Sequence, residues 1–197
     1  DGPWAVRAAV REVAKAGADV VKIFLDGEEL SAHARPGVLS YTDDEVAAAC
    51  DEAHLRGLRV ACHARSAAAV KQAVRHGVDF VGHANFLDDE AVEMLAAARD
   101  RLFVGPGIAW EIQLLERGHE IGLSRAMMEA RGYQRELDET IGSVKRLREV
   151  GVRLLIGGDY GLSITPHGTN AKDLEYFVDL FGMSPGEALL CATRDGG

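Results

Sequence analysis

Apolar positions along the chain fall into two patterns, short continuous runs and stripes with helical spacing. The runs have little internal polar alternation, which is typical of strands buried on both faces of a parallel sheet. Five runs are predicted to be strands, at residues 19–25, 59–62, 79–82, 102–105 and 152–159. Amphipathic segments separate nearly all of them. The pattern therefore predicts an α/β protein built from βαβ units.

Capping residues mark where several of the predicted helices begin and end. The sequence from Thr42 to Glu45 has the form of a capping box, and the sequence from Ser184 to Glu187 has the same form with a proline at the first helical position. Ser66 and Asp88 are placed as N-caps, and Gly77 is placed to end a helix. These local signals support the alternation of strands and helices.

Two of the predicted strands are each followed at once by a histidine. His63 follows the run at residues 59–62, and His83 follows the run at residues 79–82, with one helix between them. Parallel strands joined by one helix bring their carboxyl ends to the same edge of a sheet, where α/β folds bind their ligands. Two imidazoles at that edge suggest a metal site.

Composition narrows the classes of partner. The chain has 197 residues, is 47% hydrophobic and carries a formal net charge of −9. No basic stripe is present to bind a nucleic acid, and no apolar run approaches the ~18–20 residues that a membrane span needs. We therefore expect a small-molecule substrate, with no nucleic acid and no membrane partner, and self-association into a homo-oligomer is left open. We expect a cytoplasmic protein whose true N-terminus precedes residue 1.

The cysteines do not form a recognisable site. Cys50, Cys62 and Cys191 are far apart and odd in number. This pattern favours reduced thiols in core or helix positions over a disulfide framework or a zinc knuckle.

The number of strands leaves the architecture open between two arrangements. A (β/α)₈ barrel needs eight strands and typically ~250 residues, so five strands fit either an open doubly wound sheet or part of a barrel. The glycine-rich turn that binds phosphate in dinucleotide-binding folds is missing after every predicted strand. Periodicity alone does not decide between the two.

Residues at the strand ends carry a family resemblance. Lys22 in VVKI, His63 in ACHA, His83 in GHANF and Asp159 in GGDYG follow one another as in the amidohydrolase superfamily. The sequence most resembles the imidazolonepropionase-like branch, which includes metal-dependent dipeptidases and amide- or urea-cleaving hydrolases. Residues 165–193 also resemble the closing helices of that family.

The resemblance implies a fold as well as a site. It predicts that residues 1–197 form a partial metal-dependent hydrolase barrel domain, an α/β partial TIM (β/α)₈ barrel made of strands four to eight. The first strands with their His-x-His pair, and the small β-sandwich of the family, are expected to be missing from this stretch. The fragment alone is therefore expected to be inactive.

The resemblance also implies a reaction. Lys22 as a carbamate, His63, His83 and Asp159 would bind divalent metal, two zinc ions or cobalt, manganese or iron in their place. A metal-bound hydroxide would then cleave a C–N bond of amide, dipeptide, carbamate or urea type, with Asp159 as the catalytic proton carrier. Lys22 lies within an apolar run, so we expect it to be buried.

Several alternatives stay open from the residues alone. A deaminase of the same superfamily would use one metal, and a non-catalytic scaffold on the same barrel would use none. Arg65 and Asn85 lie two residues beyond the two histidines and, with His167, are weaker candidates for substrate contacts. Each of these polar residues also has an ordinary structural interpretation, as a surface, core, capping or turn residue.

Overall fold

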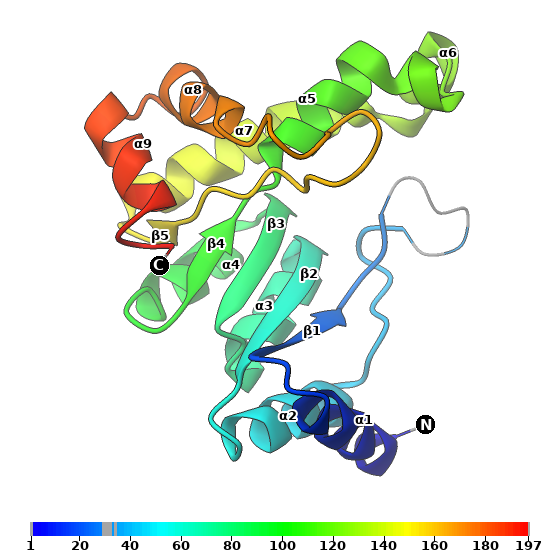
Figure 1. Cartoon of the computed structure of the whole chain (residues 1–197), viewed down its shortest axis with the longest axis vertical. Helices are drawn as coiled ribbons and strands as arrows, with labels where there is room; N and C mark the ends of the chain where they lie inside the picture. The colour runs from blue at the N-terminus through cyan, green and yellow to red at the C-terminus, as the bar shows by residue number, and fades with distance from the viewer. Residues whose placement is uncertain (1, 29–32, 34, 197) are drawn as a thin grey trace. The chain divides into compact units, whose positions relative to one another are not determined.

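The computed structural model describes residues 2–28, 33 and 35–196. Strands and helices alternate as far as α5 (Ile108–Arg117), and the strands of the described residues form a five-stranded sheet in the order β1-β2-β3-β4-β5 (Figure 1). The two strand pairs with a defined register, β1 with β2 and β4 with β5, are both parallel. The predicted α/β class with a parallel sheet is confirmed.

The chain divides into two compact units. The first comprises Asp1–Gly82 and Leu87–Leu102, and the second comprises His83–Phe86 and Phe103–Gly197. The boundary falls within β3 (Phe80–Phe86), immediately before His83. A single barrel domain over residues 1–197 stays a prediction.

The first unit contains two parallel strands, four helices and the beginning of β3. Helices α2 and α3 each pack against β2, and each helix from α1 to α4 packs against the next one along the chain. The elements are α1 (Pro3–Lys15), β1 (Val20–Phe24), α2 (Asp43–His54), β2 (Arg59–Ser66), α3 (Ala67–His76) and α4 (Asp89–Ala97).

The predicted caps of these helices are present. The Thr42 hydroxyl accepts a hydrogen bond from the Glu45 backbone N–H, and the Glu45 carboxylate accepts one from the Thr42 backbone N–H. Ser66 caps α3 through the Ala69 backbone N–H. Gly77 ends α3 with a left-handed φ of 85°. These local patterns were sufficient to place the helix ends.

The expectation that β1 is buried on both faces is wrong. Val21 is the buried residue of this strand, whereas Lys22 is exposed and Phe24 is half exposed. The reason is position in the sheet, because β1 is the terminal strand in the sheet order and pairs with β2 along one edge. An apolar sequence run therefore predicted the strand but not its burial.

A buried carboxylate joins α1 to α2. Glu52 of α2 accepts hydrogen bonds from the guanidinium groups of Arg7 and Arg11, at 3.2 and 2.6 Å, and Arg56 lies 2.7 Å away. Its side chain is 4% exposed. The hydrogen bond from Arg11 is the largest cause that lowers the pKa of Glu52, to about 2. This carboxylate thus stays charged at pH values well below the ordinary pKa of a glutamate.

The second unit is mostly helical. Its helix α5 packs against α7 and α8, and α8 packs against α9. The elements are β4 (Phe103–Gly105), α5 (Ile108–Arg117), the 3₁₀ helix η1 (Gly118–Ile121), α6 (Arg125–Arg131), α7 (Tyr133–Glu149), β5 (Arg153–Leu154), α8 (Lys172–Asp179) and α9 (Pro185–Ala192). An apolar cluster joins α5, α6 and the start of α7, and contains Trp110, Leu114, Leu123, Met128, Tyr133 and Ile164.

The last predicted strand is much shorter than expected. β5 comprises only Arg153–Leu154, and the Leu155 backbone N–H makes one more bond to the Val104 carbonyl. Residues 155–161, which include Gly157 and Gly158, belong to no strand or helix, and this irregular stretch, the Asp159 turn, contains Asp159 with a left-handed φ. Two glycines lower the preference for an extended chain, so the apolar run VRLLI could not continue as a strand to residue 159.

No helix among the described residues has both the length and the apolar character needed to cross a membrane.

We predict that Glu52→Gln weakens the docking of α1 and makes the protein less sensitive to acid. A carboxylate whose pKa is lower in the folded state contributes stability above its unfolded pKa of about 4.5, and loses it as the pH falls towards 2. Urea denaturation between pH 2 and pH 7 should show a lower stability for the variant at pH 7 and a flatter acid limb. The control is Glu93→Gln at an exposed position of α4. Equal acid limbs in wild type and Glu52→Gln would contradict the prediction.

Candidate functional site

His63 is held in a defined orientation inside the first unit. β2 continues to Ser66, so His63 lies within the strand rather than at its end, and it is 3% exposed. The ring of Phe24, its register partner on β1, stacks on the imidazole with centroids 4.5 Å apart and an interplanar angle of 18°. The His63 Nε2 atom lies 3.4 Å from the carbonyl oxygen of Gly27.

The surroundings of His63 keep its imidazole neutral. Burial is the largest cause that lowers the pKa of His63, to about 4, and the charges of Arg65 and Lys22 lower it further. A neutral imidazole retains a lone pair, which is the form that binds zinc and similar metals. Lys22 lies on the neighbouring strand, with its Nζ atom 5.3 Å from the Phe24 ring centroid.

A buried aspartate that sequence reasoning missed fixes the chain next to His63. Asp26 is 1% exposed, and its carboxylate accepts hydrogen bonds from the backbone N–H groups of Arg65, Ser66 and Gly37, at 2.9, 2.9 and 3.0 Å. It therefore joins the chain after β1 to the end of β2. Its position directly after a strand was the one available signal, and that signal is shared by many turn residues.

Arg65 is positioned by the same contact. Its backbone N–H binds Asp26, its side chain is 3% exposed, and its guanidinium lies 3.7 Å from the Glu28 carboxylate. A buried guanidinium beside His63 fits the predicted contact with a substrate carboxylate, which stays a prediction.

The second unit contains the other two predicted ligands close together. The His83 Nε2 atom lies 3.8 Å from Asp159 Oδ2, a separation longer than a hydrogen bond. His83 is nearly buried, whereas the Asp159 side chain is 48% exposed. A buried imidazole therefore faces a carboxylate that is open to solvent.

Both residues have strained backbones. Among the described residues, His83, Ala84 and Asp159 are the non-glycine residues with left-handed φ angles, of 79°, 54° and 57°. Such conformations cost of the order of 1–3 kcal/mol each and cluster at functional sites. Their coincidence with two predicted ligands marks this part of the second unit as the candidate site.

Gly107 makes room for the His83 ring. A Cβ atom on Gly107 would lie 2.9 Å from His83 Nδ1, and the glycine itself has a φ of 70°. Only glycine meets both demands, a left-handed backbone and a side chain that leaves the imidazole in place.

Asn85 lies in a buried polar network rather than on an open surface. Its side-chain amide nitrogen donates to Glu111 Oε1 at 2.6 Å and to Thr140 Oγ1 at 2.7 Å, while its backbone carbonyl oxygen accepts from the Ser143 hydroxyl at 2.7 Å. All four residues are at most 5% exposed. A substrate contact by the Asn85 amide would require it to leave these partners, so its observed contacts favour a role in holding β3.

The turn that carries Asp159 is fixed by its neighbours. The Asp159 carbonyl oxygen accepts from the Thr165 hydroxyl at 3.1 Å, and the Tyr160 hydroxyl donates to Asp173 Oδ1 at 3.0 Å. Burial raises the pKa of the Asp173 carboxyl to about 6, against the opposing effect of hydrogen bonds from Tyr160 and the Gly157 backbone. Sequence reasoning did not identify Tyr160 or Asp173. His167 is exposed and lies against Gly161 of the same turn.

The predicted ligands are thus distributed over the two units. Lys22 and His63 lie on adjacent strands of the first unit, and His83 and Asp159 face each other in the second. Within the described ranges, no group of three or more His, Cys, Asp or Glu side chains is arranged to hold a metal ion. The complete four-residue metal site stays a prediction.

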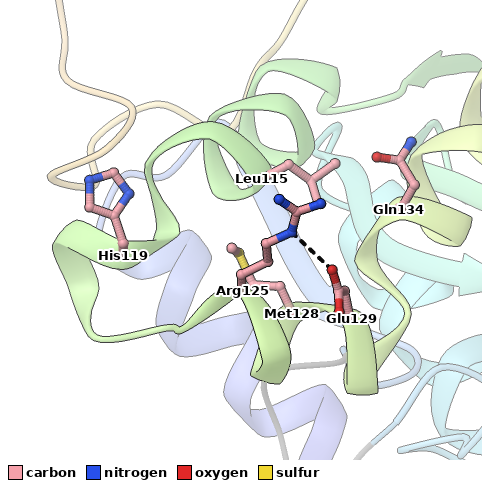
Figure 2. Close-up of a pocket in the computed structure, with 6 residues that line it drawn as sticks. All are labelled: Leu115, His119, Arg125, Met128, Glu129 and Gln134. Carbon is pink, nitrogen blue, oxygen red and sulfur yellow. Dashed lines mark hydrogen bonds and ion pairs between the residues drawn. The ribbon is translucent and has the colours of Figure 1, made fainter.

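One cavity of the second unit lies away from these residues. A cavity of about 500 Å³ between α5, α6 and α7 is shown in Figure 2, where Arg125 and Glu129 form an ion pair at its edge. None of the predicted site residues lines it; its walls are formed by Leu115, His119, Arg125, Met128, Glu129 and Gln134.

Comparison with known proteins gives matches along nearly the entire chain. The sequence model described as "Amidohydrolase family" matches residues 1–196. Ochratoxinase of Aspergillus niger is 28% identical over 195 residues, which cover 99% of this chain but 39% of ochratoxinase. The chain therefore spans about two-fifths of the length of this curated relative.

Solved structures agree with the sequence matches. The crystal structure of A. niger ochratoxinase matches with a TM-score of 0.86 at 25% identity, covering 99% of this chain and 42% of that one. A Xaa-Pro dipeptidase with methionine bound in its active site matches with a TM-score of 0.85 at 31% identity, covering 100% and 47%. A prolidase complexed with N-methylphosphonate-L-proline matches with a TM-score of 0.86 at 27% identity, covering 98% and 45%.

We predict that Gly107→Ala destabilises the protein more than Gly122→Ala does. Both glycines have left-handed φ angles, so each alanine costs about 1–2 kcal/mol in backbone energy, but Gly122 has no neighbour within 4 Å. Only the alanine at 107 should displace the His83 ring. Chemical denaturation measures the difference in stability, and the imidazole nitrogen resonances of His83 report the displacement. Equal losses of stability with unchanged resonances would contradict the prediction.

Proposed function

Because the chain belongs to the amidohydrolase family, we propose that the whole protein is a hydrolase that cleaves C–N bonds. The predicted partial (β/α)₈ barrel is confirmed by the match to structures of this family, of which the chain covers less than half. The observation that carries the functional proposal is the facing pair of His83 and Asp159, both on left-handed backbone.

The relatives favour one substrate class within that reaction type. The structures that match at 25% identity or more include a Xaa-Pro dipeptidase, a prolidase and ochratoxinase. We therefore propose an amide or dipeptide as the substrate, ahead of a carbamate or a urea. The buried Arg65 would bind a carboxylate of that substrate, because a guanidinium matches a carboxylate in a bidentate manner. His167, exposed near the Asp159 turn, is a weaker candidate for a substrate contact.

The donor residues fit divalent metal, which this family generally uses. We propose that Lys22 as a carbamate, His63, His83 and Asp159 hold it, as two zinc ions or cobalt, manganese or iron in their place. His63 fits because its lowered pKa keeps the imidazole neutral, and His83 fits because its Nε2 atom lies 3.8 Å from the Asp159 carboxylate. When bound, divalent metal supplies Lewis-acid polarisation of a carbonyl and of water.

The chain's own residues then have distinct roles. The exposed carboxylate of Asp159 can take a proton from the attacking water and deliver it to the leaving amine. His83, packed on Gly107, keeps its position beside that carboxylate. Asn85 holds the strand that carries His83 through Glu111 and Thr140.

The number of metal ions bound per chain distinguishes the hydrolase from two alternative functions. A deaminase of the same superfamily would need one metal and no carbamate on Lys22, and a scaffold would need no metal. We favour the hydrolase because Lys22 lies on the strand next to His63, where a carbamate would add a ligand. About two metals per full-length chain supports the hydrolase, one supports the deaminase, and none supports the scaffold.

We predict that Asp159→Asn in the full-length protein retains most of its metal but loses hydrolysis by about 10²–10⁴-fold, because an amide cannot accept the proton. His63→Asn should instead lose metal affinity first and recover activity with excess metal. The measurement is kcat together with bound metal for both variants on one amide substrate. Should Asp159→Asn lose metal and activity in parallel and regain both with added metal, Asp159 acts as a ligand only.

We predict that Lys22→Ala in the full-length protein loses metal and activity, with partial rescue by short carboxylic acids. The added acid would replace the carbamate oxygens in the space that the shortened side chain leaves. The control is Lys15→Ala at the exposed end of α1, which removes the same charge elsewhere in the first unit. Unchanged metal content and turnover in Lys22→Ala would rule out the carbamate.

A further inference from the structure

The turn that carries Asp159 lacks the usual support of a strand. β5 ends at Leu154, and Asp159 follows in a left-handed conformation that a non-glycine residue rarely adopts. Without sheet hydrogen bonds, such a conformation persists only where surrounding groups determine it. The Thr165 hydroxyl supplies one such contact, to the Asp159 carbonyl oxygen.

A buried carboxylate supplies contacts on both sides of Asp159 in the sequence. Asp173, in the first turn of α8, is fully buried and accepts a hydrogen bond from the Tyr160 hydroxyl at 3.0 Å. The backbone of Gly158 lies against the same carboxyl group, too close to Asp173 Oδ1 for a Cβ atom to fit. Asp173 thus contacts the chain on both sides of Asp159, at Gly158 and at Tyr160.

The turn is also packed tightly against the same two side chains. A Cβ atom at Gly158 would lie 2.5 Å from Tyr160 Cε2, 2.6 Å from Ala109 Cβ and 2.8 Å from Asp173 Oδ1. Gly158 has no left-handed φ, so its backbone conformation does not require glycine. Glycine is required there because any side chain would clash with these neighbours. At the neighbouring Gly157 a Cβ atom would meet nothing within 4 Å.

The arrangement is unfavourable for folding alone. A fully buried carboxyl group is costly, and the second oxygen, Asp173 Oδ2, has no hydrogen-bond partner among the described residues. An apolar pair of similar size would pack this position at lower cost. Buried polar groups that lack hydrogen-bond partners are often found at functional sites, where they hold other residues in position.

We propose that Tyr160 and Asp173 are positioning residues that hold the 157–161 turn so that the Asp159 carboxylate faces His83. This inference rests on the proposed function of Asp159. Tyr160 and Asp173 act through the turn, without touching the reacting atoms.

The test uses Tyr160→Phe, Asp173→Asn and the double variant in the full-length protein. Tyr176→Phe is the matched control, since it removes a phenol hydroxyl from α8 whose partner is Gln113 rather than the turn. Each positioning variant should lower kcat by about 10²-fold, the scale of a small misplacement of a reacting group. KM, metal content and global stability should change little, and the double variant should be no worse than either single variant because both break one contact.

A second measurement does not depend on catalysis. Hydrogen exchange of the amides of residues 157–165 in the metal-free protein should speed up in Asp173→Asn and Gly158→Ala but not in Tyr176→Phe or Gly157→Ala. The two glycine variants are matched, because both positions lack a left-handed φ and only one lacks space.

The outcomes separate the two claims. Unchanged exchange in Asp173→Asn and Gly158→Ala would overturn the positioning role. Faster exchange with unchanged kcat would also overturn it, since the turn would then be held for stability alone. An inactive wild-type protein would instead overturn the proposed function of Asp159, and the exchange data would still decide whether the pair holds the turn.

Discussion

Left-handed backbone at His83, Ala84 and Asp159 is the constraint on which the second unit depends. Each left-handed conformation costs free energy. Contacts within the unit must therefore make other backbone conformations at these residues still higher in free energy. Gly107 leaves space for the His83 ring, and the network around Asn85 fixes the strand just beyond it. What results is an imidazole and a carboxylate that face each other at 3.8 Å, a placement that a regular strand end would not give.

The first unit meets a different requirement, which is to keep His63 neutral and oriented. Burial and the nearby cations Arg65 and Lys22 disfavour its protonation, while stacking on Phe24 fixes the plane of the ring. A metal ligand needs both properties, because a protonated imidazole has no lone pair to donate and a mobile ring pays entropy on binding. In the first unit, burial, nearby charges and stacking thus fix the charge and orientation of His63. In the second unit, the backbone conformation fixes the position of His83.

The helix ends could be predicted from the sequence, because they depend on residues that are close together along the chain. The capping box at Thr42 and the glycine at 77 lie within one turn of the structure they determine, so their pattern was sufficient. Exposure of Lys22, in contrast, depends on the place of β1 in the sheet, which the residues around Lys22 do not encode. Glu111 was missed as a partner of Asn85 because 26 residues separate them, and no local pattern records such a contact.

Three buried carboxylates show how the fold supports the predicted ligands. Asp26 binds the backbone N–H two residues after His63, Glu111 binds the side chain two residues after His83, and Asp173 binds the side chain one residue after Asp159. A buried carboxylate is costly unless donors satisfy it, so each is tied to one arrangement of the chain it contacts. In each case the contact holds the chain immediately downstream of a predicted ligand and leaves the ligand's own nitrogen or oxygen atoms for other partners. The polar interior of both units is therefore best understood as the support of these residues rather than as a source of stability.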